Sequence, residues 1–423
     1  MEGFEKRSSV PSAQQYTQGA AFTPGPQGRR GRAGGANPLK KYAILFLVVA
    51  FLGYIGWQAF LYIGSDLSHR GLPARPGTGN ANINSTLPSK GNENRAAIRP
   101  AIHYKRPAFE AGIVFPEWHP DGYSASWQQQ LPAIQMQSGA RWIEMTLFLS
   151  QATPTSTQVR TNQSVATVES FAAGVRAAHA LGYHVFVVPL MGVDSPPGSW
   201  AASVHFSNYQ DEAKWFDSYW QTYQPYVVAA QQAGADQLAI ATETVWLQRS
   251  AAPALWNTLI QRVRSVFTGI LTYDMDWTTL NDPLPAWMKN PQLALIGVSE
   301  YISLANTSVR IDPPKIFSMW KSVIKTALDR ASIELGKPLV ISEIGYRNSA
   351  DTLYNSWNPR ALGSPPDPQE QAAAYDAALA NVIPDEHIMG IFFWGWDNVG
   401  GFKLSGQQLT LEVLHKWYTS PQS

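Results

Sequence analysis

The chain has 423 residues and nearly balanced charge, with 32 Lys and Arg against 31 Asp and Glu. It has no cysteine, which excludes disulfides, thiolate zinc sites, iron–sulfur clusters and cysteine nucleophiles. Residues 1–41 and 65–107 each carry a net charge of +5 and residues 108–423 carry −9, so the acidic C-terminal part argues against a nucleic-acid partner.

The N-terminal region contains one segment that is apolar enough to cross a membrane. Residues 42–64 contain no charged side chain, and 23 residues of helix span about 30 Å of hydrocarbon at about 1.5 Å per residue. The run ends with Leu61, Tyr62 and Ile63 rather than with the small residues of a cleavage site. We therefore predict a transmembrane signal-anchor helix over residues 40–64, with a cleaved signal peptide as the main alternative.

Basic residues on one side of this segment predict its orientation. Five of them precede or adjoin it: Arg29, Arg30, Arg32, Lys40 and Lys41. Because basic residues favour the cytoplasmic side, we expect a single-pass protein of the cell membrane with a cytoplasmic N-terminus and an extracellular C-terminal domain. The flanks have few apolar residues, which predicts a disordered basic tail over residues 1–39 and a flexible extracellular linker over residues 65–107.

From about residue 108, short apolar runs alternate with helical stretches. Eight runs predict strands, at residues 111–115, 141–148, 183–190, 237–242, 269–273, 294–299, 338–342 and 389–395. The runs are continuously apolar, which is typical of parallel strands covered on both faces. Four helical stretches end at a glycine that leads into the next strand: Gly139, Gly182, Gly234 and Gly336. Two further helices are predicted to begin at Asp312-Pro313 and at Asp367-Pro368-Gln369-Glu370.

Strand–helix alternation repeated eight times predicts the fold class α/β, as a (β/α)₈ TIM barrel over residues 108–423. An open doubly wound sheet is the alternative, but no G-x-G-x-x-G motif follows the first strand. In such barrels the active site lies at the C-terminal ends of the strands. Ionisable residues at those positions are therefore the candidates for chemistry.

Two glutamates follow predicted strands at that end of the barrel. Glu243 follows the fourth strand and Glu343 follows the seventh. A carboxyl group beside an apolar strand is partly desolvated, which raises the pKa of one member of a pair while the other stays ionised. Each glutamate alone could equally be a solvated strand-end residue or an ion-pair partner. As a pair in one barrel they indicate acid/base and nucleophilic chemistry.

The residues around both glutamates form short motifs, A-T-E-T at 241–244 and S-E-I-G-Y at 342–346. Four others accompany them: L-T-Y at 271–273 with Trp277, I-G-V-S-E-Y at 296–301, Q-A-x-x-Y-x-A from Gln371, and F-W-G-W at 393–396. Together these resemble glycoside hydrolase family 113, a family of retaining clan A glycosidases that includes β-mannanases. The chain differs from the family pattern at four positions, and none of them removes a catalytic carboxylate: Ala241 for Gly, Ser299 for Asp, Glu300 for a small residue, and Gly395 for an acidic residue.

The resemblance implies a role for each residue of a site. Glu243 would be the general acid/base and Glu343 the nucleophile, with their carboxyl groups about 5–5.5 Å apart. Tyr301 would orient the nucleophile, unless it is a core tyrosine. Trp394 or Trp396 would be the sugar platform, and strand alternation predicts that both point to the same side. Four residues on strand-end loops could contact sugar hydroxyls or simply pack in their loops: Trp118, His119, Asp276 and Trp277.

The sequence lacks the motifs of other catalytic classes. No H-E-x-x-H or clustered metal spacing, no G-x-S-x-G elbow and no P-loop occurs, so we expect no metal and no cofactor. The prediction is a membrane-anchored extracellular retaining glycoside hydrolase that cleaves β-glycosidic bonds in an oligo- or polysaccharide, with β-1,4-mannan as the substrate that the resemblance suggests. The alternative is a catalytically inactive carbohydrate-binding barrel of the cell envelope.

Overall fold

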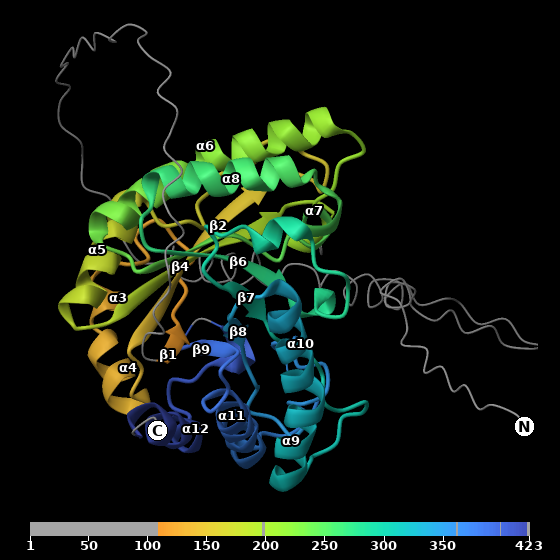
Figure 1. The fold of residues 1–423 in the computed structure, drawn as a ribbon. Coiled ribbons are helices and arrows are strands. Elements are labelled where there is room, and N and C mark those ends of the chain that lie inside the picture. The colour runs from red at the N-terminus through yellow and green to blue at the C-terminus, as the bar shows by residue number, and fades with distance from the viewer. Residues whose placement is uncertain (1–108, 197–198, 361–362, 398, 421–423) are drawn as a thin grey trace, which may run out of the picture. The chain divides into compact units, whose positions relative to one another are not determined.

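Eight parallel strands form a closed barrel (Figure 1). The structure is a computed structural model that describes residues 109–196, 199–360, 363–397 and 399–420. The barrel strands are β1 (Glu110–Val114), β2 (Trp142–Gln151), β4 (His184–Val193), β5 (Gln237–Thr242), β6 (Ile270–Asp276), β7 (Ile296–Ser299), β8 (Leu339–Ile344) and β9 (Ile388–Trp394). All eight predicted strands are present in this order, and the β1–β2 pairing closes the sheet. The predicted TIM barrel is confirmed, and the doubly wound alternative is wrong.

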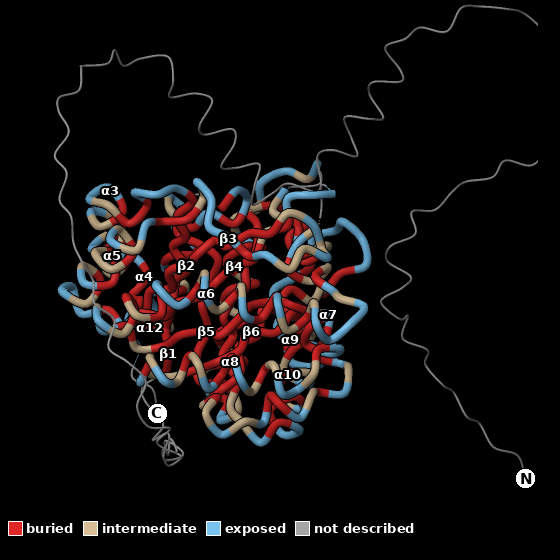
Figure 2. Tube along the Cα trace, turned by 90° about the horizontal axis from the view of Figure 1, so that it is seen from above, coloured by how far each residue is buried: buried red, intermediate tan, exposed pale blue. Residues whose placement is uncertain are grey.

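The strands are buried on both faces, as their continuous apolar sequences predict (Figure 2). Side chains that alternate along the strands fill the barrel interior, among them Val114, Phe186, Ala239, Val340 and Phe392. The side chains between them face outward and pack under the helices. Gly112 of β1 has a structural reason to be glycine, because a Cβ there would lie 2.2 Å from the ring of Phe392.

Helices surround the barrel (Figure 1). The α-helices are α3 (Ala125–Gln128), α4 (Leu131–Ser138), α5 (Val168–Ala180), α6 (Tyr209–Ala233), α7 (Val245–Ser250), α8 (Pro253–Val266), α9 (Pro313–Trp320), α10 (Thr326–Leu335), α11 (Pro368–Val382) and α12 (Gln408–Thr419). Five short turns complete them: η2 (Ala201–Ser203), η3 (Trp277–Thr279), η4 (Ala286–Lys289), η6 (Gly400–Phe402), and the π-helical η5 (Lys321–Lys325) between α9 and α10. The two-residue strand β3 (Val159–Arg160) pairs antiparallel with β2.

The predicted helix-terminating glycines and N-cap residues act as expected at every position except one. The four predicted glycines have left-handed φ angles between +64° and +91°. The carboxylate of Asp367 accepts the N–H of Glu370 at 2.9 Å and caps α11. Asp312 precedes α9, but its side chain makes no capping bond. The reason is that Pro314 has no N–H to donate, and the N–H of Lys315 bonds the main-chain oxygen of Asp312 instead.

None of the helices within residues 109–420 that the structure describes is long and apolar enough to cross a membrane. The predicted anchor at residues 40–64, the tail at 1–39 and the linker at 65–107 lie outside the described residues. Those three predictions therefore stay predictions.

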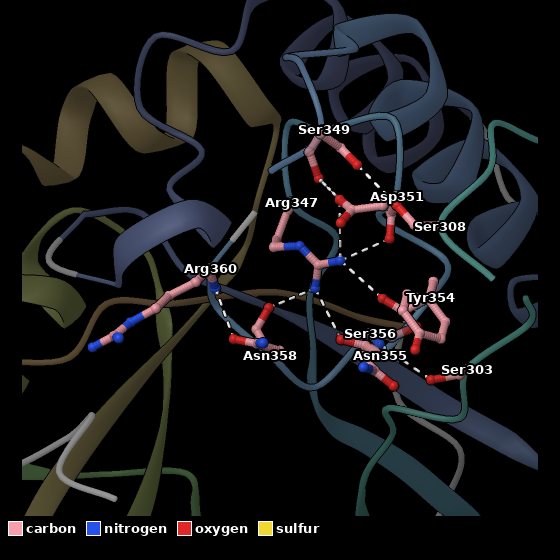
Figure 3. A network of polar contacts seen from close by, with 11 residues as sticks. Ser303, Ser308, Arg347, Ser349, Asp351, Tyr354, Asn355, Ser356, Asn358 and Arg360 are labelled. Carbon is pink, nitrogen blue, oxygen red and sulfur yellow. Dashed lines mark hydrogen bonds and ion pairs between the residues drawn. The ribbon is translucent and has the colours of Figure 1, made fainter. Parts of the chain in front are cut away.

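The segment between β8 and α11 is held by one buried arginine (Figure 3). The guanidinium of Arg347 donates to the main-chain oxygens of Asp351, Tyr354, Asn355 and Asn358 at 2.5–2.9 Å, and it also pairs with the carboxylate of Asp351 at 3.4 Å. Only 1% of Arg347 is exposed. A single side chain thus fixes the shape of a segment that begins directly after the seventh barrel strand.

Replacing Arg347 with Met is expected to lower the free energy of unfolding by about 3–5 kcal/mol, because Asp351 and four carbonyl groups lose their donor in a buried place. Urea denaturation measures the change. The control is Arg360→Met on the same segment, since Arg360 is exposed and points away from the cluster (Figure 3). That control should stay within about 0.5 kcal/mol of the parent. Equal effects of the two substitutions would contradict this role of Arg347.

Candidate active site

Glu243 directly follows β5 at the C-terminal end of the barrel. Its φ angle is +52°, a left-handed backbone conformation that is uncommon for a residue other than glycine. The N–H of Glu243 donates to the main-chain oxygen of Asp274 on β6 at 2.8 Å, which holds the strained turn in place. The side chain is half-buried. The turn therefore places a carboxyl group at the edge of the barrel, where sequence analysis expected it.

Glu343 is the second-to-last residue of β8, whereas the sequence placed it directly after the strand. Its main-chain oxygen accepts the N–H of Glu300 at 2.6 Å, which ties β8 to the end of β7. The hydroxyl of Tyr301 donates to Oε1 of Glu343 at 2.8 Å. Tyr301 itself is buried and packs against Phe402, with ring centroids 5.8 Å apart. The predicted contact between Tyr301 and Glu343 is therefore present.

The two glutamates differ in their electrostatic surroundings. Burial raises the pKa of Glu343 to about 8, and the hydrogen bond from Tyr301 opposes this rise by stabilising the carboxylate. Burial also raises the pKa of Glu243 well above its usual range, and the negative charge of Glu343 raises it further. The charge of Glu343 thus favours the protonated form of Glu243, and the Tyr301 hydrogen bond favours the ionised form of Glu343, as a proton donor and a nucleophile require.

Replacing Tyr301 with Phe removes the hydrogen bond that lowers the pKa of Glu343. We expect the acid limb of the kcat/KM profile to move to higher pH, with a loss of about 10- to 100-fold in kcat/KM at neutral pH. The control is Tyr418→Phe, whose buried hydroxyl donates to the main-chain oxygen of Gly112 instead. A pH profile that moves equally in both variants would contradict the assignment.

A third carboxyl group, missed by sequence analysis, lies beneath the pair. Asp274 on β6 is 1% exposed and accepts the hydroxyl of Ser342 at 2.5 Å and that of Ser299 at 3.3 Å. Burial raises the pKa of Asp274 to about 7. The sequence signal was its position directly after the strand predicted at residues 269–273, the same placement that selected Glu243 and Glu343.

Replacing Asp274 with Asn removes a negative charge that raises the pKa of Glu343. The acid limb of the pH profile should therefore move to lower pH, opposite to its movement in Tyr301→Phe. Because the asparagine amide nitrogen cannot accept a hydrogen bond, one of the two serine hydroxyls loses its acceptor atom, and we also expect kcat to fall by roughly tenfold. A shift in the same direction as that of Tyr301→Phe would contradict this electrostatic account.

Other predicted site residues are distributed around the same end of the barrel. Asp276 is the last residue of β6 and accepts the N–H of Thr278 at 2.8 Å, while burial raises its pKa. Trp277 is half-buried and packs against the interior cluster. His119 is exposed and pairs with Glu117 at 3.2 Å, and the hydrogen bond to Glu117 raises its pKa. Sugar contacts of these residues stay predictions.

The two tryptophans of the last strand do not face the same side, contrary to expectation. Trp394 belongs to the interior cluster, where its ring centroid lies 6.2 Å from that of Trp118. Trp396 packs in the outer cluster, and its indole N–H donates to Oε1 of Gln130 at 2.9 Å. The alternation fails because β9 ends at Trp394, so residue 396 no longer follows the strand geometry. Trp394 and Trp118 are the tryptophans that line the interior at this end.

No group of three or more His, Asp or Glu side chains suited to a metal ion occurs in the part of the chain that the structure describes. The ionisable groups at this end of the barrel are carboxyl groups on neighbouring strands, joined by serine and tyrosine hydroxyls. They suit proton transfer and covalent catalysis by a carboxylate.

This geometry and the comparisons with known proteins define the protein as a glycoside hydrolase built on a (β/α)₈ barrel. The sequence model of Glycoside Hydrolase Family 113 matches residues 118–406. The chain belongs to this family. No curated protein matches the chain.

Solved structures share the barrel fold. A GH113 β-1,4-mannanase is 20% identical with a TM-score of 0.62, over 74% of this chain and 100% of that chain. The GH113 β-mannanase AaManA from Alicyclobacillus acidocaldarius, in complex with ManMIm, is 19% identical with a TM-score of 0.62, over 74% and 98%. The β-glucuronidase of Ruminococcus gnavus is 12% identical with a TM-score of 0.52, over 74% of this chain and 50% of that chain. At these identities the likeness shows the fold.

Proposed function

We propose that this hydrolase cleaves β-glycosidic bonds with retention of configuration, with Glu343 as nucleophile and Glu243 as general acid/base. The observation that carries the proposal is the placement of two carboxyl groups at the ends of β5 and β8, one of them accepting the Tyr301 hydroxyl at 2.8 Å. Family membership supports it, because the residues that match the family, 118–406, include both glutamates.

The chemistry takes two steps. In the first, a carboxylate oxygen of Glu343 bonds the anomeric carbon, the bond to the leaving oxygen breaks, and the proton of Glu243 passes to that oxygen. In the second, Glu243 takes a proton from water, the water oxygen bonds the anomeric carbon, and the bond to Glu343 breaks. Two inversions give net retention. Burial and the charge of Glu343 raise the pKa of Glu243, which lets it start protonated, and the Tyr301 hydrogen bond stabilises the released carboxylate of Glu343.

We propose β-1,4-mannan as the substrate, since two of the similar structures are described as mannanases. The test is an assay of the full-length chain on β-1,4-mannan, β-1,4-glucan, β-1,4-xylan and matching aryl β-glycosides. Proton NMR of the first product follows the anomeric configuration. Initial release of the β-anomer supports the proposal, and initial release of the α-anomer excludes double displacement. Glycan binding without turnover would favour a carbohydrate-binding barrel instead.

For its location, we propose that residues 42–64 anchor the protein in the cell membrane with the barrel outside. The charge-free span and the adjoining Lys40 and Lys41 support this. Protease added to intact cells should then release a soluble barrel by cutting between residues 65 and 107. Complete protection of the barrel in intact cells, with cleavage after lysis, would contradict the proposed orientation.

A further inference from the structure

Exposed tryptophans gather at one end of the barrel. Of the tryptophan side chains that the structure describes, three are exposed: Trp246 at 56%, Trp200 at 42% and Trp357 at 38%. Each lies on a segment that follows a strand at its C-terminal end, after β5, β4 and β8 respectively. Single exposed apolar side chains are normal, whereas several on one side of a molecule mark a binding surface more often.

Trp246 lies closest in sequence to the acid/base. It is in the first turn of α7, three residues after Glu243. The ring of His205 lies beside it, with centroids 5.8 Å apart and planes inclined by 41°. His205 is fixed by two bonds, since Nδ1 donates to the main-chain oxygen of Ser203 at 2.8 Å and its N–H donates to that of Pro154 at 3.1 Å. The two rings therefore form a preorganised exposed surface.

Trp200 lies on the neighbouring connection. It forms a bridge with Gly192 near the end of β4 and directly precedes η2. The η2 turn packs against α7, which carries Trp246. The two exposed indoles therefore lie on adjacent segments, one after β4 and the other after β5. His205 lies on the connection between η2 and α6. Sequence spacing alone does not predict this, because 46 residues separate Trp200 from Trp246.

The side of the cleaved bond on which this surface lies follows from the chemistry. Glu243 gives its proton to the leaving oxygen, so the leaving-group sugar lies on the side of Glu243. We propose that Trp246, His205 and Trp200 form a binding site for the leaving-group sugars of a β-linked polysaccharide. The flat indole faces suit the C–H faces of pyranose rings, and the polar edge of His205 suits their hydroxyls. This inference rests on the proposed function.

The proposed site makes catalytic efficiency depend on the length of the substrate. Binding energy from several sugars beyond the leaving oxygen is available only to an oligosaccharide, because an aryl glycoside has a single small ring on that side. The enzyme therefore prefers bonds within a chain that have several sugars on the leaving-group side.

The experiment compares Trp246→Ala and Trp200→Ala in the full-length chain on two substrates, β-1,4-mannohexaose and a nitrophenyl β-mannoside. We expect kcat/KM for the hexaose to fall by about 10- to 100-fold, and to fall at least tenfold more than kcat/KM for the aryl substrate. The matched control is Phe317→Ala, an aromatic residue 40% exposed on the outer helix α9. It should leave the ratio between the two substrates unchanged.

An equal fold-loss of kcat/KM on both substrates, which leaves their ratio unchanged, would contradict the proposed site. Calorimetric titration of the hexaose into Glu343→Gln, with and without Trp246→Ala, separates this result from failure of the proposed function. Binding that weakens about tenfold or more on loss of Trp246 upholds the site even if the parent chain shows no turnover. Affinity that does not depend on Trp246 rejects the site whatever the parent chain hydrolyses.

Discussion

Glu343→Gln is expected to lower kcat on every β-glycoside by on the order of 10⁴-fold or more, with little change in melting temperature. The amide cannot form the bond to the anomeric carbon, so the covalent intermediate is lost. The fold should persist because the amide oxygen still accepts the Tyr301 hydroxyl, and because the substitution removes a buried ionisable group whose pKa burial already raises. Initial rates and a thermal melt on the same sample measure both effects.

The matched control is Glu300→Gln. Glu300 is a buried neighbour of Tyr301 and its carboxylate accepts the N–H of Ile302 at 2.7 Å, which an amide oxygen can also do. The same isosteric change there should cost far less activity than the change at Glu343. Full activity in Glu343→Gln, or an equal loss in both variants, would exclude Glu343 as the nucleophile while leaving the barrel unchanged.

Glu243→Ala should show an effect that depends on the leaving group. Natural glycans need a proton on the departing oxygen, so their hydrolysis should fall by several orders of magnitude, on the order of 10³-fold or more. An activated nitrophenyl glycoside departs without protonation, so its first step should be affected much less and the glycosyl–enzyme should accumulate. A burst of nitrophenolate followed by slow turnover measures this accumulation.

Azide distinguishes the two glutamates by product stereochemistry. In Glu243→Ala, azide attacks the glycosyl–enzyme from the vacated side and should give the β-glycosyl azide from an activated substrate. In Glu343→Ala no glycosyl–enzyme forms, so azide that occupies the nucleophile's place should give the α-glycosyl azide. Exchanged products would mean that the two glutamates have exchanged roles, and no rescue in either variant would contradict double displacement.

Much of the barrel could be predicted because its signals are local. The eight apolar runs and the left-handed glycines, such as Gly139 and Gly336, depend on neighbouring residues alone. Glu243 and Glu343 could be selected because a strand end is recognisable in sequence and the fold places all strand ends together.

The rest depends on which strands become neighbours. Asp274 directly follows the strand predicted at residues 269–273, but its role depends on Ser299 and Ser342, which come from two other strands that meet only in the closed barrel. Trp396 was placed on the wrong side because the last strand ends at Trp394, and strand ends are set by tertiary packing. The surface formed by Trp200 and Trp246 likewise depends on the packing of η2 against α7.

The way in which Arg347 holds the segment after β8 has a consequence for how this enzyme can change. Arg347 binds main-chain oxygens, which every amino acid provides, so the side chain at a position such as 354 is not needed for these hydrogen bonds. Asn355 and Asn358 are more restricted, because Asn355 has a φ angle of +47° and the side chain of Asn358 accepts the N–H of Arg360. At its unrestricted positions the segment can therefore accept new residues beside β8 while keeping its path. For protein engineering, this makes it a region where libraries of variants can alter substrate choice without first losing the scaffold.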